Sequence, residues 1–218
     1  MSRSAGLALE AILLTAPPAM GADTVADRVF GAGLLADVTQ PVLLRYRYEM
    51  TGQGIDTPYA SHIDVDVRDI AADGGKSVYL DMFEGADHRS LGPIAAREQN
   101  PMVLAFLQRD VTRMAKLTGG AAVYYQQQVP RAFTQAAESE PFEVGLGDRK
   151  LPGLRLVIKP LANEPHIGRF PQYRDKTYEF VVADGIPGGI YRVASRTPDP
   201  KDGHVILEET VTFKGATP

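Results

Sequence analysis

The sequence of 218 residues contains no cysteine. Disulfide bonds, thiolate nucleophiles and thiolate metal sites are therefore excluded, and so is a lipid anchor on an N-terminal cysteine. In an oxidising compartment such a fold depends on its core alone. The 21 glycines and 16 prolines are spread along the chain, which indicates many turns and hence many short strands.

An excess of positive charge is also missing. The 23 Lys and Arg residues are outnumbered by 27 Asp and Glu residues, which gives a formal net charge of −4 without any block of like charge. Proteins that read nucleic acids usually present a basic face, so we expect no nucleic-acid partner. A composition of 44% hydrophobic and 23% charged residues is typical of a folded globular domain.

Recognisable catalytic motifs are absent from the sequence. It has no Gly-x-Ser-x-Gly elbow, no phosphate-binding loop and no Gly-x-Gly-x-x-Gly fingerprint. A serine triad could still be assembled from scattered residues, because triads are defined by geometry and not by order. We predict that the protein is not an enzyme and needs no cofactor.

The four histidines show no spacing typical of a helical zinc site, since none lies three or four residues from another: His62, His88, His166 and His204. His62 shares one face of a predicted strand with Asp64 and Asp66, and these three side chains could hold a metal ion. A solvated strand face is the simpler interpretation, so we predict no metal site.

Residues 1–21 resemble an export signal. Arg3 supplies a positive charge, residues 5–19 are mostly apolar, and Ala19 and Gly21 are small residues at the positions that signal peptidase requires. The apolar run is too short for a permanent membrane anchor, and no other stretch is long enough. The alternative is a buried or amphipathic helix broken by Pro17 and Pro18. We predict a signal peptide over 1–21, a single domain over 22–218, no integral membrane segment and a periplasmic location.

Alternating hydrophobicity dominates the first part of this domain. After a short helix predicted over 24–36, apolar and polar residues alternate from Pro41 onward, then over 63–67 and again over 78–82. A period of two is typical of strands that bury one face. We expect these three strands to form an antiparallel meander, with Tyr46 and Tyr48 on the inward face of the first strand.

The clearest helix is predicted over 100–119. Asn100 is a favourable N-cap, Pro101 suits the first helical position, and Gly119 suits the end. One broad face of this helix is apolar and includes Phe106 and Met114. We expect this face to pack on the sheet.

Strand patterns resume after the helix. We predict strands over 121–129, 142–146, 154–161, 178–182, 190–195 and 205–213, a long loop over 163–174, and either a short helix or a continued strand over 131–140. Strands and helices do not alternate, which argues against a parallel α/β sheet. The total is about nine strands and two or three helices.

The order of these elements resembles the LolA-like periplasmic carriers of lipoproteins and lipids. The most similar stretches are Tyr46-Arg47-Tyr48, the helix over 100–119, and residues 178–191 with their Pro-Gly-Gly turn. The resemblance implies an α+β fold of mainly antiparallel β structure, with a curved sheet or an incomplete β-barrel wrapped on a central helix. The arginine found in the cavity of these carriers cannot be located in this sequence, so the resemblance does not carry lipoprotein binding with it.

Asp110 is the most informative candidate residue, because it lies inside the apolar face of the helix. An unpaired carboxylate there would cost several kcal/mol, roughly, or would take up a proton. Arg113 is three residues further on and within reach. The structural interpretation is an Asp–Arg pair that holds the helix on the sheet; the functional one is a polar anchor in a cavity wall.

Other candidate ligand-binding residues are aromatic or lie in the long loop. Tyrosines that line an open sheet can bracket a lipid chain, although they can equally be ordinary core residues. In the loop over 163–174, His166 and nearby arginines could meet an anionic head group, unless the loop is only solvated. The complete candidate set is Tyr46, Tyr48, Phe106, Asp110, Arg113, Met114, Tyr124 and His166.

The sequence therefore predicts an exported protein that binds or carries a hydrophobic ligand, a lipid or an acyl chain, in the periplasm. One alternative is a cell-envelope interaction module with a packed core and a protein partner; a second is a periplasmic hydrolase. The volume and the lining of the space between sheet and central helix distinguish these functions.

Overall fold

The computed structural model describes residues 25–218, except 31–33, 54, 97–99, 121 and 136–137. The signal peptide predicted over 1–21 lies outside the described residues. Within the described part of the chain, no helix combines the length and the apolar character needed to cross a membrane.

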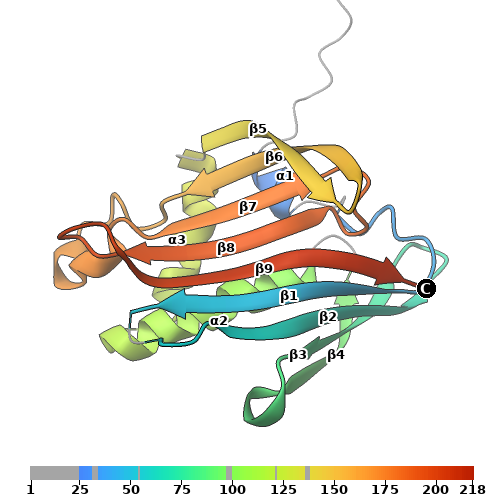
Figure 1. Cartoon of the computed structure of the whole chain (residues 1–218), viewed down its shortest axis with the longest axis horizontal. Helices are drawn as coiled ribbons and strands as arrows, with labels where there is room; N and C mark the ends of the chain where they lie inside the picture. Colours follow the sequence, from blue (N-terminus) through green and yellow to red (C-terminus); the bar gives the residue numbers. More distant parts are fainter. Residues whose placement is uncertain (1–24, 31–33, 54, 97–99, 121, 136–137) are drawn as a thin grey trace, which may run out of the picture.

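Nine antiparallel strands form a single open sheet in the order β4-β3-β2-β1-β9-β8-β7-β6-β5 (Figure 1). Two meanders, β1 to β4 and β5 to β9, are joined by the pairing of β1 with β9. The strands are β1 (Val42–Gly52), β2 (Tyr59–Ile70), β3 (Lys76–Met82), β4 (Arg89–Ala96), β5 (Glu138–Leu146), β6 (Arg149–Ile158), β7 (Thr177–Ala183), β8 (Ile190–Pro198) and β9 (Val205–Thr217).

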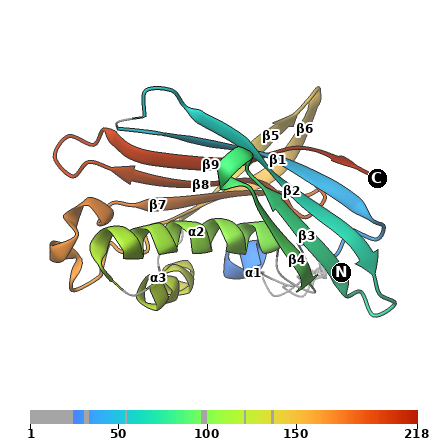
Figure 2. The ribbon, with the colours of Figure 1, turned by 90° about the horizontal axis from the view of Figure 1, so that it is seen from below.

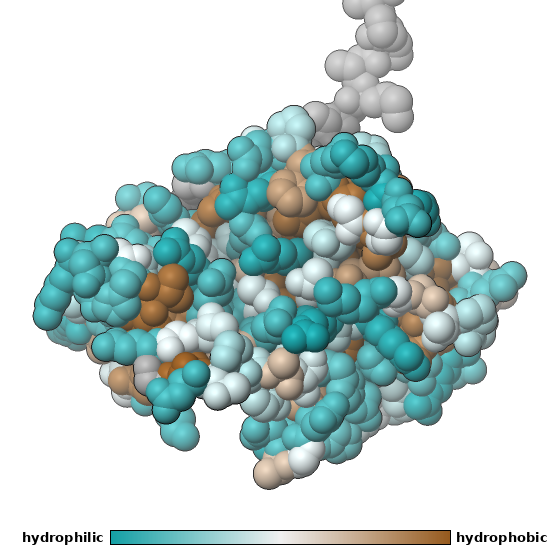
Figure 3. Space-filling model, in the orientation of Figure 1, coloured by the Kyte–Doolittle hydropathy of each residue, from teal (hydrophilic) through white to brown (hydrophobic). Residues whose placement is uncertain are grey.

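Three helices lie on one side of the sheet: α1 (Val25–Phe30), α2 (Pro101–Thr118) and α3 (Ala122–Gln135) (Figure 2). The other face of the sheet is mostly hydrophilic, with separate hydrophobic patches (Figure 3). An open, curved antiparallel sheet packed on a central helix is the fold class that the sequence predicts, and the prediction is confirmed.

The strand pattern explains where the core lies. Leu44, Tyr46 and Tyr48 of β1 are buried, whereas Arg45 and Arg47 between them are exposed. Successive side chains of a strand point to opposite faces of the sheet, so one face of β1 meets the helices and the other meets water. The predicted meander of β1, β2 and β3 is confirmed by their antiparallel pairing.

The predicted ends of α2 are confirmed. The Asn100 side chain accepts a hydrogen bond from the Met102 backbone N–H at 3.0 Å, and Gly119 ends the helix with a φ of 66°. A positive φ at this position costs glycine little, because it has no Cβ.

The strand predicted over 121–129 is wrong, because residues 122–129 belong to α3. Its valine and tyrosines favour a strand by propensity. The buried residues Tyr125, Val129 and Phe133 instead follow at intervals of four, which is the period of a helix packed along one face. The ambiguous stretch over 131–140 contains both structures, since α3 ends at Gln135 and β5 begins at Glu138.

Strand β4 is absent from the sequence-based prediction. Its residues are almost all exposed, so neither face produces an alternating pattern. One strand was thus predicted wrongly and one was missed, so the predicted number of about nine strands agrees with the nine in the described residues. The first helix is described over Val25–Phe30, and residues 34–36, which were predicted to belong to it, form a turn. The long loop contains the short 3-10 helices Ile167–Arg169 and Pro171–Tyr173.

Candidate functional site

An apolar groove of about 780 Å³ lies between α2, α3 and the strands β3 and β4. Among the described lining residues, only Gln108 and Gln126 are polar. The size is within the range of ligand-binding clefts, roughly 300–1,000 Å³. The lining residues are Phe30, Leu80, Leu91, Ile94, Pro101, Leu104, Ala105, Leu107, Gln108, Val111, Gln126, Val129, Pro130 and Phe133.

The open edge of the sheet leaves this groove accessible. Strand β4 is the last strand on its side, so the apolar surface of α2 and α3 beside it is not covered by a further strand. Leu91 of β4 is 45% exposed to solvent, and Leu104 of α2 is 41% exposed. Large apolar side chains in such positions are typical of sites that bind an apolar partner or ligand.

A side cavity of about 340 Å³ adjoins the groove, and both are lined by Leu91, Ala105 and Gln108. The side cavity differs in having charged residues. Its lining includes Asp87, Arg89 and Arg109, beside aromatic rings of Tyr48 and Phe83. The side cavity therefore places charged groups next to an otherwise apolar groove.

Glu209 of β9 is buried beneath α2 and binds two arginines of this helix. Arg109 and Arg113 both form ion pairs with its carboxylate, and the Tyr48 hydroxyl donates a hydrogen bond to it. Glu209 is 1% exposed. Burial and the neighbouring Glu209 carboxylate raise the pKa of Tyr48, so the tyrosine remains a donor at neutral pH.

Asp110 is paired, but not with Arg113 as the sequence predicts. Its carboxylate lies 3.1 Å from the Lys176 ammonium and accepts a hydrogen bond from the Tyr178 hydroxyl. Asp110 and Lys176 are 2% and 1% exposed. The prediction fails because Lys176 is 66 residues away in sequence, whereas Arg113, the near neighbour, bonds to Glu209.

The other predicted residues on β1 and α2 belong mainly to the core. Tyr46 packs against Phe213, and its hydroxyl makes no hydrogen bond of normal geometry with a described residue. Phe106 and Tyr48 line the side cavity. Met114 lies in a second apolar cluster and is not among the residues that line the groove.

Tyr124 and His166 line a third cavity of about 180 Å³, beneath the long loop. This cavity also includes Glu164, Arg169 and Phe170. The eight predicted residues are thus divided among two smaller cavities and the core, and none of them lines the apolar groove itself.

The residues that form the groove were not identified from the sequence. Four come from α3, whose first part was predicted as a strand and whose second part was left open between a helix and a strand, and two come from β4, which was not predicted. The signal that could have found α3 is the spacing of Tyr125, Val129 and Phe133.

Histidines and carboxylates gather at two exposed places. On the outer face of the sheet, His62 Nε2 and His88 Nε2 lie 3.6 and 3.1 Å from Asp81 Oδ1. Asp66 does not join His62 in a common site, since it pairs with Arg68.

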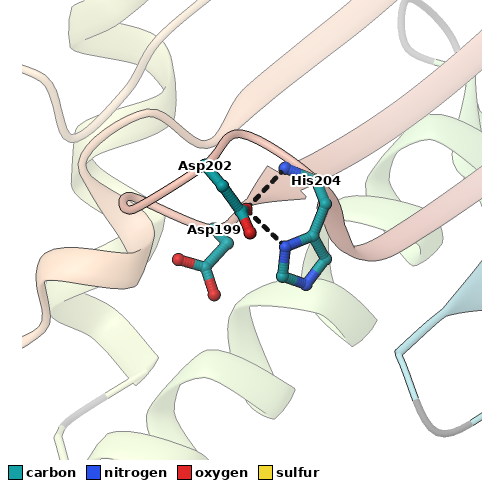
Figure 4. Close-up of side chains that lie close together, drawn as sticks. All are labelled: Asp199, Asp202 and His204. Carbon is teal, nitrogen blue, oxygen red and sulfur yellow. Dashed lines mark hydrogen bonds and ion pairs between the residues drawn. The ribbon is translucent and has the colours of Figure 1, made fainter.

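The second place is the connection between β8 and β9, where Asp199, Asp202 and His204 lie close together (Figure 4). Hydrogen bonds from the backbone and the ring of His204 lower the pKa of Asp202. These groups are at the surface, and no described serine bonds to a histidine. Among the described residues, no Ser or Asp lies within hydrogen-bond distance of a histidine inside one of the three cavities, which is the arrangement that would favour a hydrolase.

Comparison with known proteins gives structural neighbours only. No family model and no curated protein matches the sequence. Mycobacterium tuberculosis lipoprotein LppX is similar over 84% of this chain and 93% of its own, with 11% identity and a TM-score of 0.33. A LolA superfamily protein from Nitrosomonas europaea is similar over 89% and 93%, with 7% identity and a TM-score of 0.24. What this chain binds is therefore inferred from its own groove.

Proposed function

We propose that this protein binds the acyl chain of a lipid in the groove between α2, α3 and β4, and carries it through the periplasm after export. The observation that supports the proposal is the groove itself, which is large, apolar and open at a sheet edge. Export rests on the sequence of residues 1–21.

Burial of an acyl chain in this groove gives loose, reversible binding. Burying about ten methylene groups at ~0.8 kcal/mol each yields ~8 kcal/mol. Immobilising the ligand costs at least ~4 kcal/mol of this, which leaves at most ~4 kcal/mol, or a dissociation constant of about 1 mM, so tighter binding requires contacts with the rest of the lipid. An interaction module with a packed core would have no need of a cavity of this size beside its central helix.

Fluorescence titration of delipidated protein with a fatty acid that carries a fluorescent tail group tests the proposal. Ala105 lines both the groove and the side cavity, so Ala105→Trp fills them and should weaken binding by about tenfold or more. Ala60→Trp, at an exposed position of β2, is the matched control and should bind like the unmodified chain.

Leu104→Asp provides a second variant, because this side chain is 41% exposed and its loss does not open the core. A charge at this position should repel an acyl chain while the melting temperature stays close to that of the unmodified chain. Absence of saturable binding, or equal binding by both groove variants and the control, would contradict the proposal.

A further inference from the structure

The interface between α2 and the sheet carries one positive charge more than its carboxylates can neutralise. Three cations, Arg109, Arg113 and Lys176, face two carboxylates, Asp110 and Glu209. The buried tyrosines that bond to these carboxylates add no negative charge, because burial raises their pKa. An uncompensated charge in a partly desolvated place is unfavourable, so an external anion would stabilise it.

Arg109 is the member of this set that a ligand can reach. Its side chain is 36% exposed and lines the side cavity, whereas Lys176 is fully enclosed. The guanidinium lies 5.1 Å from the ring centre of Tyr48 and 4.7 Å from that of Phe83. Contact with two rings holds its position before any ligand arrives.

One edge of the Arg109 guanidinium makes no hydrogen bond to a described residue. Its hydrogen bonds to described residues all start from Nη1, which donates to the Tyr48 hydroxyl and to Glu209. Nε and Nη2 have no acceptor among the described residues. A pair of N–H groups on one edge is the arrangement that binds a carboxylate or phosphate with two parallel hydrogen bonds.

The position of Arg109 relative to the groove fits a ligand with a polar end. Ala105, which lines both cavities, is one helical turn before Arg109, or roughly 6 Å along the axis of α2. Arg89 of β4 lines the same side cavity, and its charge offsets that of Asp87 there. A chain in the apolar groove can therefore extend its head group to Arg109.

We infer that the ligand is an acidic amphiphile, whose carboxylate or phosphate head binds Arg109 in the side cavity while its chain occupies the groove. This inference rests on the proposed function, and it assigns the class of lipid. Arg109 binds the head group directly, and Arg89 adds a weaker attraction at the exposed side.

Calorimetric titration of the delipidated full chain with four probes tests the inference: hexadecanoic acid, hexadecyl phosphate, hexadecanol and inorganic phosphate. The two acidic probes should bind about tenfold or more tightly than the alcohol, since hydrogen bonds to charged groups are worth ~1.5–3 kcal/mol. Inorganic phosphate alone should bind weakly, because it lacks the chain.

Arg109→Gln should weaken the acids about tenfold and leave hexadecanol within about twofold of its affinity for the unmodified chain. Glu209 keeps Arg113 as its partner in this variant. Arg89→Gln changes an exposed residue and should weaken only the acids, by a smaller factor. Arg47→Gln, on the outer face of the sheet, is the matched control and should change nothing.

Equal affinity for hexadecanoic acid and hexadecanol would overturn the inference and leave the proposed function standing. An equal loss of acid and alcohol in Arg109→Gln would do the same. Tight binding of inorganic phosphate alone would identify a phosphate site in place of an amphiphile site. Failure of every chain-bearing probe to bind would overturn the proposed function as well.

Discussion

Two buried carboxylates, Asp110 on α2 and Glu209 on β9, hold the central helix on the sheet. Each is at most 2% exposed, and each binds a cation across the interface between helix and sheet: Glu209 binds Arg113 of α2, and Asp110 binds Lys176, which directly precedes β7. Because a buried charge is tolerated only with a partner, these pairs link α2, and with it one wall of the groove, to the sheet side of the interface.

Removal of one partner from the Asp110 pair should be strongly destabilising. Asp110→Ala leaves the Lys176 charge buried without a counter-ion, which costs about 3–5 kcal/mol in the free energy of unfolding. Urea denaturation measures this change. The double variant Asp110→Leu with Lys176→Met removes both charges and should recover much of the loss. An unchanged midpoint for Asp110→Ala would contradict this role.

Loss of the hydroxyl should affect stability differently at two buried tyrosines. Tyr178→Phe removes a donor from the Asp110 carboxylate and should lower stability by about 1–3 kcal/mol. Tyr46→Phe removes a buried hydroxyl without a hydrogen bond of normal geometry and should be neutral or stabilising. Thermal unfolding of the two variants side by side provides the comparison, and a similar loss in both would contradict the assignment.

The raised pKa values of three buried tyrosines predict that the protein loses stability at alkaline pH. Burial raises the pKa of Tyr46, Tyr48 and Tyr178 above the value of about 10 that they have in the unfolded chain. Above pH 10 the unfolded chain releases protons that the folded chain retains, so the stability present below pH 10 is lost as the pH rises. Each tyrosine contributes up to about 1.4 kcal/mol per pH unit. Tyrosine absorbance at high pH should show these three ionising only together with unfolding.

At the scale of single residues, the sequence predicts that the Asp110 carboxylate needs a partner, but it does not predict which residue supplies it. Asp110 is identifiable as a carboxylate on an apolar helix face, because that depends only on nearby residues. Lys176 and Tyr178 come from another part of the chain, and their approach depends on how the sheet curves over α2. Glu209 was missed for the same reason, since its burial depends on the placement of α2 above β9.

Helix α2 is the element that local sequence determines best. Its cap, its first proline and its final glycine are all read from residues at its own ends. The Asn100 side chain also donates to the Gly188 backbone carbonyl at 3.3 Å, and so links the start of the helix to the turn between β7 and β8.

Asn100→Ala should therefore cost more than the loss of an ordinary cap. Both the capping bond and the Gly188 bond disappear, which lowers stability by about 1–3 kcal/mol in a denaturant titration. Asn163→Ala in the exposed loop is the matched control and should change stability little. Equal effects of the two substitutions would contradict the role of Asn100 in fixing α2.

Helix α3 and strand β4 show where element prediction fails. Propensity favoured a strand for the start of α3, but packing of Tyr125, Val129 and Phe133 along one face decides for a helix. Strand β4 forms because β3 offers a free edge for pairing, not because its own residues alternate. Both depend on tertiary context, which a single sequence does not contain.

The groove is a property of the whole molecule. It exists because the nine-stranded sheet does not close, so that β4 ends beside α2 and α3 and leaves their apolar surfaces accessible. The fold class was predictable, since it follows from the order and period of the elements. The location of the groove was not predictable, because two of the elements that line it, the first part of α3 and the strand β4, were mispredicted or missed.

The most direct test of the account is photo-crosslinking of delipidated protein with a fatty acid that carries a diazirine near the end of its chain, followed by peptide mapping. Binding in the groove predicts crosslinks in peptides that contain Leu91, Leu104 or Val129, and their loss in Ala105→Trp. Crosslinks confined to the outer face of the sheet, or to the third cavity beneath the long loop, would contradict it.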